Sequence, residues 1–264
     1  MLTHKDQLGR LINLSSIPQR IVSLVPSQTE LLIALGLRDW LVGITKYCIH
    51  PVELLAEKTI VGGTKQVKLE LIESLEPDLI LCNKEENRQE AVAALEKIAP
   101  VHVSDVEDMD DAIEMIGQYG HLFDCTDRAD FIIDQIQSAH DSFEQVIKHI
   151  PKRRVAYLIW RNPWMVVGNN TFIDYLLKLN HFDNVFSNGF ESRYPEIDAS
   201  ALNNVDYVLL SSEPFPFSQK HIEELQHYTD AKIIFVDGEY FSWYGDRLVA
   251  AFDYFAELQA KLAV

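Results

Sequence analysis

The stretch from Thr126 to Ile150 constrains the fold more than any other part of the chain. It contains neither glycine nor proline, and Thr126 or Asp127 can cap a helix that Pro151 would stop. Its apolar residues recur at helical spacing, namely Ala129, Ile132, Ile133, Ile136, Ala139, Phe143, Val146 and Ile147. About 24 residues at 1.5 Å each give roughly 36 Å of helix. The pattern therefore predicts one helix that is longer than the average globular helix.

Short apolar strands alternate with amphipathic helices on both sides of this segment. Strands are predicted at residues 20–24, 41–44, 78–81, 101–103, 154–159, 206–210 and 232–236, and helices at 26–36, 69–75, 90–98, 172–179 and 247–262. In the first of these helices, Ser27 and Glu30 have the spacing of a capping box. Apolar strands between helices indicate mostly parallel sheets covered on both faces. The sequence thus predicts an α/β protein with two lobes, residues 1–122 and 152–264, joined by a backbone helix within residues 123–151.

The net charge and the cysteine content limit the classes of binding partner and the cellular compartments that fit this chain. With 23 basic and 40 acidic residues the chain carries −17, which disfavours nucleic acid and anionic lipid surfaces. No run of eighteen apolar residues predicts a membrane span, and the N-terminus shows no secretory leader. The three cysteines suggest neither a disulfide framework nor a CxxC metal site. The chain as written fits the cytoplasm, and the periplasm if a leader has been removed.

Aromatic and basic side chains follow the predicted strands in both halves. In open α/β sheets, ligands bind beyond the carboxyl ends of the strands. Three of the four tryptophans lie in these loops beside single Arg and Glu residues, which suits a large, flat, partly apolar ligand. The alternative is that some rings only close the loop ends against the sheet. The predicted ligand-binding residues are Tyr47, His50, Thr64, Lys65, Asn83, Trp160, Arg161, Trp164, Arg193, Tyr194, Phe215, Phe241 and Trp243.

Signals for an enzyme are weak. The chain has no GxGxxG, no GxxxxGK[ST], no GxSxG and no HxxxH pair, so no catalytic residue, catalytic cofactor or metal site is predicted. His50 is the exception among nine scattered histidines, because it follows a strand and can serve as a lone ligand to a metal such as cobalt. The acidic clusters at residues 85–86 and 105–111 are interpreted as solvated faces.

Basic residues lie beside the aromatic loops although the chain is strongly acidic. Their placement suggests that each of them meets a negatively charged group there. That partner is either an anionic group of the ligand or an internal carboxylate such as Glu213, Glu239 or Asp246. The ligand role is favoured for Arg161 and Arg193, and the internal role for Arg247. On this reading, R161A weakens ligand binding by about 1.5–3 kcal/mol and leaves thermal stability almost unchanged.

The stretch RIVSLVPSQTELLIALGL, residues 20–37, resembles the opening of class III periplasmic binding proteins, particularly their cobalamin-binding branch. The order and spacing continue through VGIT at 42–45, Tyr47, HP at 50–51, VGGT at 61–64, LELI at 69–72 and EPDLI at 76–80. The second lobe matches more loosely, through Trp160, SRYP at 192–195 and DYV at 206–208. The resemblance covers most of the chain, and its first-lobe motifs are fairly specific.

This resemblance implies a substrate-binding protein that holds a ligand in a cleft between lobes joined by a rigid helix. The ligand would be cobalamin, haem or a ferric siderophore, delivered to an ABC transporter permease. Each lobe of such a protein offers one glutamate to the permease; the first-lobe position matches Glu70, whereas the second falls at Ser200, with Glu191 and Glu196 nearby. We expect a monomer.

An enzyme of corrinoid or metal-chelate metabolism, related to chelatases or nitrogenases, is the alternative from a different functional class. Such an enzyme places histidine, cysteine or paired carboxylates in its cleft, whereas a receptor places aromatic residues and arginine there. The loops of this chain are rich in aromatic residues, which favours the receptor. The sequence does not choose between cobalamin, haem and a siderophore.

Overall fold

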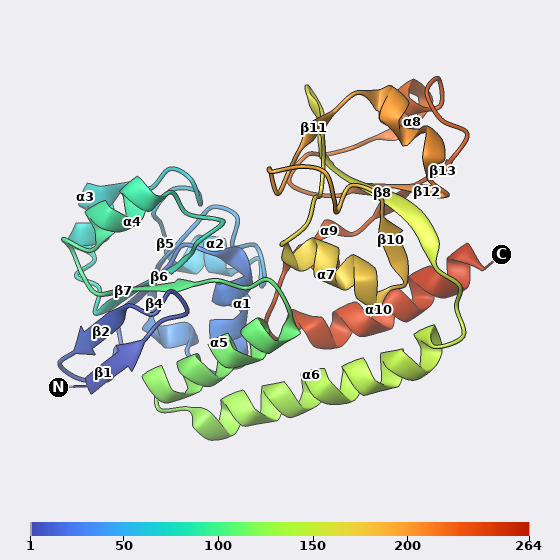
Figure 1. Cartoon of the computed structure of the whole chain (residues 1–264). Helices are drawn as coiled ribbons and strands as arrows, with labels where there is room; N and C mark the ends of the chain where they lie inside the picture. The colour runs from blue at the N-terminus through green and yellow to red at the C-terminus, as the bar shows by residue number, and fades with distance from the viewer. Residues whose placement is uncertain (1, 264) are drawn as a thin grey trace. The chain divides into compact units, whose positions relative to one another are not determined.

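The computed structural model describes residues 2–263. The chain forms two compact units: unit 1 comprises Met1–Gln137 with Trp243–Leu248, and unit 2 comprises Ser138–Ser242 with Val249–Val264. The helix α6, Thr126–Ile147, is uninterrupted, as its sequence pattern predicts (Figure 1). The boundary between the units falls within α6, and a six-residue C-terminal segment is grouped with unit 1. Neither feature was predicted from the sequence.

Unit 1 is built on a parallel sheet of five strands in the order β5-β4-β3-β6-β7. These strands are β3 (Ile21–Ser23), β4 (Leu41–Ile44), β5 (Thr59–Ile60), β6 (Leu79–Asn83) and β7 (Val101–Ser104). The connecting elements are α1 (Pro26–Ala34), η1 (Arg38–Trp40), α2 (Leu54–Glu57), α3 (Leu69–Ser74) and α4 (Gln89–Leu95), followed by α5 (Met109–Leu122). The strand β6 is buried along its whole length, in agreement with its apolar run at residues 79–82, and it ends in the buried polar residue Asn83.

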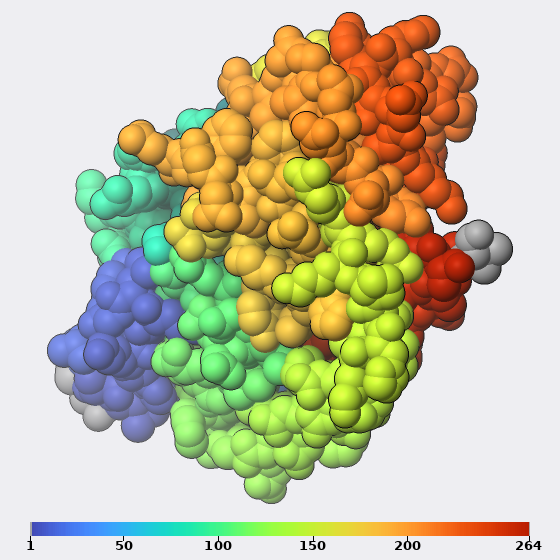
Figure 2. Space-filling model, turned by 45° about the vertical axis from the view of Figure 1, so that its right-hand side comes forward, coloured from blue at the N-terminus to red at the C-terminus, as the bar shows by residue number. Residues whose placement is uncertain are grey.

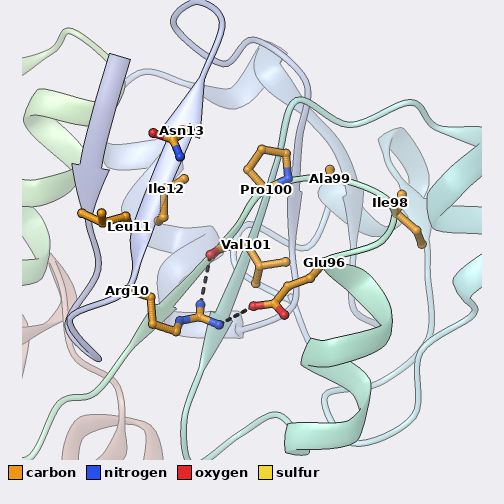
Figure 3. A pocket seen from close by; sticks show the side chains of 9 residues that line it. All are labelled: Arg10, Leu11, Ile12, Asn13, Glu96, Ile98, Ala99, Pro100 and Val101. Carbon is orange, nitrogen blue, oxygen red and sulfur yellow. Dashed lines mark hydrogen bonds and ion pairs between the residues drawn. The ribbon is translucent and has the colours of Figure 1, made fainter. Parts of the chain in front are cut away.

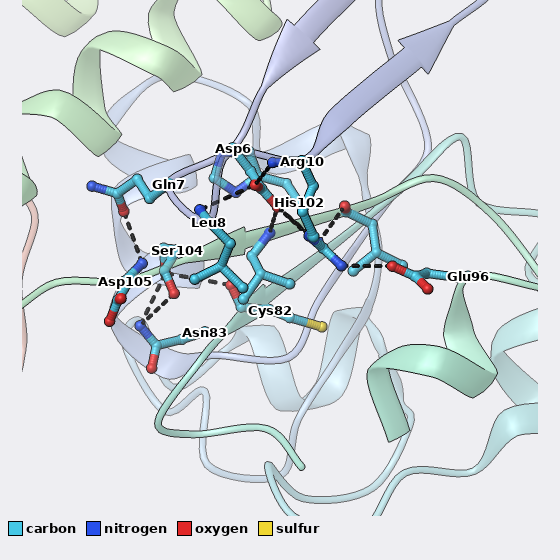
Figure 4. A network of polar contacts seen from close by, with 12 residues as sticks. Asp6, Gln7, Leu8, Arg10, Cys82, Asn83, Glu96, His102, Ser104 and Asp105 are labelled. Carbon is cyan, nitrogen blue, oxygen red and sulfur yellow. Dashed lines mark hydrogen bonds and ion pairs between the residues drawn. The ribbon is translucent and has the colours of Figure 1, made fainter. Parts of the chain in front are cut away.

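An N-terminal hairpin, which the sequence analysis did not predict, protects the edge of this sheet. Strands β1 (Leu2–Lys5) and β2 (Leu11–Leu14) pair antiparallel near the N-terminus, which is dark blue in Figure 2. The residues between the two strands hydrogen-bond to the edge strand β7. The Asp6 carboxylate accepts from the Val103 backbone N–H at 3.1 Å, and the Arg10 guanidinium donates to the Val101 carbonyl at 3.0 Å (Figure 4). An unpaired edge strand invites association with other chains, and these side chains occupy the groups that would pair.

Two local features of unit 1 differ from the sequence interpretation. Residues 105–111 are not merely a solvated face: Asp108 and Asp111 form the capping box that starts α5, whose far end reaches Leu122. Ser27 does not cap α1, because the helix begins one residue earlier, at Pro26, with Val25 at the N-cap and no side-chain cap. Glu30 is therefore not part of a capping box and pairs instead with Arg247.

Unit 2 contains a mixed sheet in the order β11-β9-β8-β12-β13, with β10 also paired to β8. The central strands β8 (Arg153–Trp160), β12 (Tyr207–Ser211) and β13 (Lys232–Val236) are parallel, as is β10 (Phe182–Asn184). Strands β9 (Trp164–Val166) and β11 (Glu196–Ile197) run antiparallel beside them. The remaining elements are α7 (Phe172–Leu179), η2 (Ala199–Asn204), α8 (Gln219–Leu225), α9 (Gly238–Ser242) and α10 (Arg247–Leu262). The predicted mostly parallel α/β architecture is thus confirmed.

Candidate functional site

Tyr47 is the most exposed aromatic residue at the carboxyl end of the unit 1 sheet. It follows β4, and 51% of its surface is accessible. The Lys46 ammonium lies 4.9 Å from the centroid of its ring, which places a cation over the aromatic face. A Cβ added at Gly63 would come within 3.1 Å of the Tyr47 ring, so the glycine lets the loop after β5 approach it closely. The ring therefore packs against the loop after β5, while about half of the residue's surface remains accessible.

His50 and Trp243 meet on the same unit although they are far apart in sequence. Their ring centroids are 5.4 Å apart in an edge-to-face arrangement. His50 is half-buried and Trp243 is 6% exposed. The structure thus brings together two residues that the sequence analysis selected separately, from the loop after β4 and from the start of the Trp243–Leu248 segment.

The polar residues selected in the first half have structural roles. Asn83 is buried; its amide donates to Ser104, and its carbonyl accepts from the backbone N–H groups of Glu85 and Glu86. The Thr64 carbonyl accepts from the Asn87 side chain at 2.8 Å. The Lys65 ammonium donates to the Glu85 carbonyl. These contacts hold the loops after β5 and β6 in place.

The strand order of unit 1 reverses between β3 and β6, which is where open α/β sheets bind ligands. In this chain a buried polar network lies there, around Gln28. Its amide donates to Ser104 Oγ at 2.6 Å and to the Tyr244 hydroxyl at 3.3 Å, and its carbonyl accepts from the Tyr119 hydroxyl at 2.7 Å. Burial raises the pKa of Tyr244 and Tyr119, so both hydroxyls stay protonated. The Tyr244 side chain is thus part of the polar network at the point where the strand order reverses.

Four aromatic rings gather after the strands of unit 2. The edge of Trp160, which is 40% exposed, meets Phe215 at a centroid distance of 5.4 Å. Phe215 lies 4.9 Å from Phe217, which stacks nearly parallel on Trp164 at 6.2 Å. Trp164 itself is only 7% exposed, so Trp160 offers the most open aromatic surface of the four. Phe217 was not among the selected residues, although it shares a loop with Phe215.

Arg161 has an internal partner that the sequence analysis did not consider. Its guanidinium pairs with Glu224 of α8 through two nitrogens, Nε donating at 3.2 Å, and lies 4.3 Å over the Trp164 ring. This ion pair lowers the pKa of Glu224. Arg247 pairs with the Glu30 carboxylate, a partner that the sequence analysis also did not name.

The remaining selected residues of the second half lie in different settings. Phe241 is fully buried and packs against Tyr157 and Phe255, so its ring belongs to the core of unit 2 and has no surface for a ligand. Arg193 and Tyr194 are half-buried in the loop before β11. The Arg193 carbonyl accepts from the Gly168 N–H at 2.8 Å, which fixes this loop beside the strand β9.

Two other features of the chain lie away from these loops. A groove of about 490 Å³ is bordered by the outer side of β2 and the amino end of β7, the opposite end of the sheet from Tyr47 (Figure 3). Arg10 and Glu96 form an ion pair across it. Among residues 2–263, His140, Asp141 and Glu144 on α6 form a grouping of potential metal ligands, but both carboxylates are exposed and the imidazole packs on Phe252. We assign no ligand to either feature.

The Asp246 carboxyl group is buried in unit 1 and has a raised pKa. Its Oδ1 atom is buried and has no hydrogen-bond partner among the described residues. Burial, and then the charge of Glu30, raise its pKa to about 6, against the opposing influence of Arg247 and Arg128. A carboxyl group whose pKa is higher in the folded state than in the unfolded state opposes folding once it ionises. The fold therefore loses stability as the pH rises from about 4 to about 6.

We expect D246N to be more stable than the wild type above pH 6. Each pKa unit corresponds to about 1.4 kcal/mol, so the rise from 3.8 to about 6 corresponds to at most about 3 kcal/mol. Urea unfolding of both proteins between pH 4 and pH 8 measures the difference, which should grow from pH 4 to pH 6 and then level off. The exposed Asp253 on α10 provides the matched control, D253N. Parallel profiles for D246N and the wild type would contradict the prediction.

Comparison with known proteins places the chain in a family. The sequence model of a family described as "Periplasmic binding protein" matches residues 21–229. An uncharacterized ABC transporter substrate-binding lipoprotein, YvrC of Bacillus subtilis (strain 168), is 29% identical over 69% of this chain, which spans 60% of the relative's length. The vitamin B12-binding protein of Vibrio vulnificus (strain YJ016) is 25% identical over 80% of this chain and 75% of its own length.

A solved structure supports the same fold. The periplasmic heme-binding protein RhuT from Roseiflexus sp. RS-1 superimposes with a TM-score of 0.79 over 93% of this chain and 99% of that protein, at 19% identity. That likeness concerns the fold, including two α/β regions and a long helix. No helix among residues 2–263 has the length and apolar character needed to cross a membrane. With more than three quarters of its residues matched by the family model, the chain belongs to the periplasmic binding protein family.

Proposed function

We propose that this chain is the substrate-binding component of an ABC importer and that it holds a flat metal chelate of the cobalamin or haem type. The observation that carries the proposal is that an exposed aromatic ring lies at the carboxyl end of a strand in each sheet: Tyr47 after β4 in unit 1 and Trp160 at the end of β8 in unit 2. Rings of this kind recognise large ligands that are partly apolar. That both sets face one cleft stays a prediction from the sequence.

Cobalamin is the first ligand to test, and haem the second. A vitamin B12-binding protein is among the relatives in sequence, and a heme-binding protein shares the fold. His50 supplies an imidazole beside Trp243, a group that can coordinate cobalt or iron. A ferric siderophore remains the third candidate.

The enzyme alternative gains no support from the cysteines. Burial raises the pKa of the Cys48 and Cys125 thiols, and that of Cys82 to about 12, so all three are protonated near neutral pH. The thiolate is the form that attacks a substrate or binds a metal. Cys48 instead lies within hydrogen-bonding distance of the hydroxyls of Thr29 and Thr45.

Binding is measured by titrating the protein with cyanocobalamin, haemin and a ferric catecholate while following tryptophan fluorescence, with N-acetyltryptophanamide as the optical control. We expect quenching by at least one ligand, and W160A to weaken its binding by about 1 kcal/mol, roughly fivefold, as for a single aromatic contact. W40F, which alters a half-buried tryptophan packed on Phe123, should leave the affinity unchanged. Calorimetry that detects no binding of any of the three ligands would contradict the proposal.

Docking to the permease is proposed through Glu70 of unit 1. Its side chain is exposed in the first turn of α3, where a partner's arginine can reach it. The second docking position is occupied by Ser200 and not by a glutamate. Ser200 is exposed, and its hydroxyl donates a hydrogen bond to Asp198 at 2.6 Å. Glu191 and Glu196 are also exposed nearby, and stimulation of the importer's ATPase by variants at these positions would identify the second contact.

A further inference from the structure

The segment Trp243–Leu248 belongs to unit 1, although the residues before and after it belong to unit 2. We call it the strap. Tyr244 fastens the strap through the buried Gln28 network, and Gly245 lies so close to Leu31 that an added Cβ would be 3.3 Å from it. Gly245 also has φ +113°, which favours glycine over any residue with a side chain. The strap is therefore held on unit 1 by specific contacts.

One ion pair lies beside the aromatic end of the strap. Arg247 donates from Nε and from a terminal nitrogen to the two carboxylate oxygens of Glu30, both at 2.7 Å. The side chains of this pair are 12% and 20% exposed, so solvent competes little with the bond. A two-point guanidinium–carboxylate contact fixes the plane of the guanidinium as well as its position.

The same guanidinium lies over the Trp243 indole. Its carbon is 4.7 Å from the ring centroid, and the His50 ring meets the indole edge-to-face. Trp243 is therefore in contact with a cation and with an imidazole. The Glu30 carboxylate fixes the position of the Arg247 guanidinium, and the guanidinium in turn restricts where the Trp243 indole can lie.

We propose that Glu30 and Arg247 are positioning residues that fix the Trp243 indole against His50, so that ligand recognition by unit 1 depends on the strap. This inference rests on the proposed function, since it takes Trp243 and His50 as part of the ligand-binding surface. Glu30 acts only through Arg247, and Arg247 acts through the ring it covers.

Four variants test the pair: E30Q, R247M, R247K and the double variant E30Q/R247M. The control is R38M, because Arg38 makes the same two-point contact with Glu57 elsewhere on unit 1, at 3.1 and 2.7 Å. The first readout needs no ligand and is the near-ultraviolet circular dichroism and fluorescence emission of Trp243. It is obtained for each variant by subtracting the spectrum of the same variant that also carries W243F. We expect E30Q and R247M to change this signal, R247K to retain part of it, and R38M to leave it unchanged.

The second readout is the affinity for cyanocobalamin and for haemin. We expect E30Q and R247M each to weaken binding about tenfold, and the double variant to bind no more weakly than R247M. E30Q preserves the shape of the side chain, so it tests the pair even if R247M does not fold. An unchanged Trp243 signal in E30Q, or wild-type affinity in E30Q beside a loss in R247M, would overturn the inference. If the wild type binds no probe, the proposed function fails, and the Trp243 signal alone decides whether the pair holds the ring.

Discussion

Replacing Asp6 with alanine should lower the free energy of unfolding by about 3–5 kcal/mol, because it removes a buried carboxylate and each buried donor left without an acceptor costs about 1–3 kcal/mol. Asp6 is 3% exposed, and its carboxylate accepts from the backbone N–H groups of Leu8, Arg10 and Val103 and from the Arg10 side chain. Removing it leaves these donors without their acceptor and exposes the outer edge of β7. Urea unfolding followed by circular dichroism measures the loss.

Edge exposure adds a second expected effect of D6A. The variant should associate at concentrations where the wild type does not, which light scattering detects. The control is E57A, which breaks the exposed Arg38–Glu57 pair and should change the melting temperature little. If D6A and E57A unfold at the same urea concentration, the Asp6 carboxylate does not hold the N-terminal hairpin against β7.

Replacing Phe241 with alanine should cost about 3–5 kcal/mol of unfolding free energy, the usual range for deleting a buried phenylalanine ring. The ring has no accessible surface and packs at centroid distances of 5.3 Å from Tyr157 and 4.8 Å from Phe255. The matched control is F235A on β13, where the ring is 47% exposed and a change of at most about 0.5 kcal/mol is expected.

Phe241 also separates a core role from a ligand role. At a temperature where F241A remains folded, it should bind the ligand with nearly the affinity of the wild type, whereas W160A should unfold like the wild type and bind more weakly. Thermal melts and fluorescence titrations on the same samples measure both quantities. If F241A lost ligand binding without losing stability, Phe241 would have to be assigned to the ligand-binding surface and not to the core.

The sequence was sufficient for the architecture because periodic patterns are local. The spacing of apolar residues predicted α6, and the apolar runs predicted β3, β4, β6, β8, β12 and β13. The hairpin β1–β2 was missed because its strands are only four residues long and partly exposed. The capping box of α5 was also overlooked, although its two aspartates are three residues apart, because the acidic cluster was interpreted as solvated.

Placement after a strand indicated which residues lie at the carboxyl end of a sheet, but not which way their side chains point. Tyr47 and Trp160 are exposed there, whereas Phe241, which follows β13 in the helix α9, is buried. Burial depends on which neighbours fill the space around a ring, and those neighbours come from distant segments.

The partners of the charged residues were likewise decided by the tertiary structure. Arg161 meets Glu224, 63 residues later, and Arg247 meets Glu30, 217 residues earlier. No local pattern connects residues so far apart, since their approach follows from how the strands are ordered and where the strap lies. Local sequence patterns therefore predict the class of fold and the loops of the candidate site. Which side chains in those loops are held internally and which are exposed depends on the packing of distant segments.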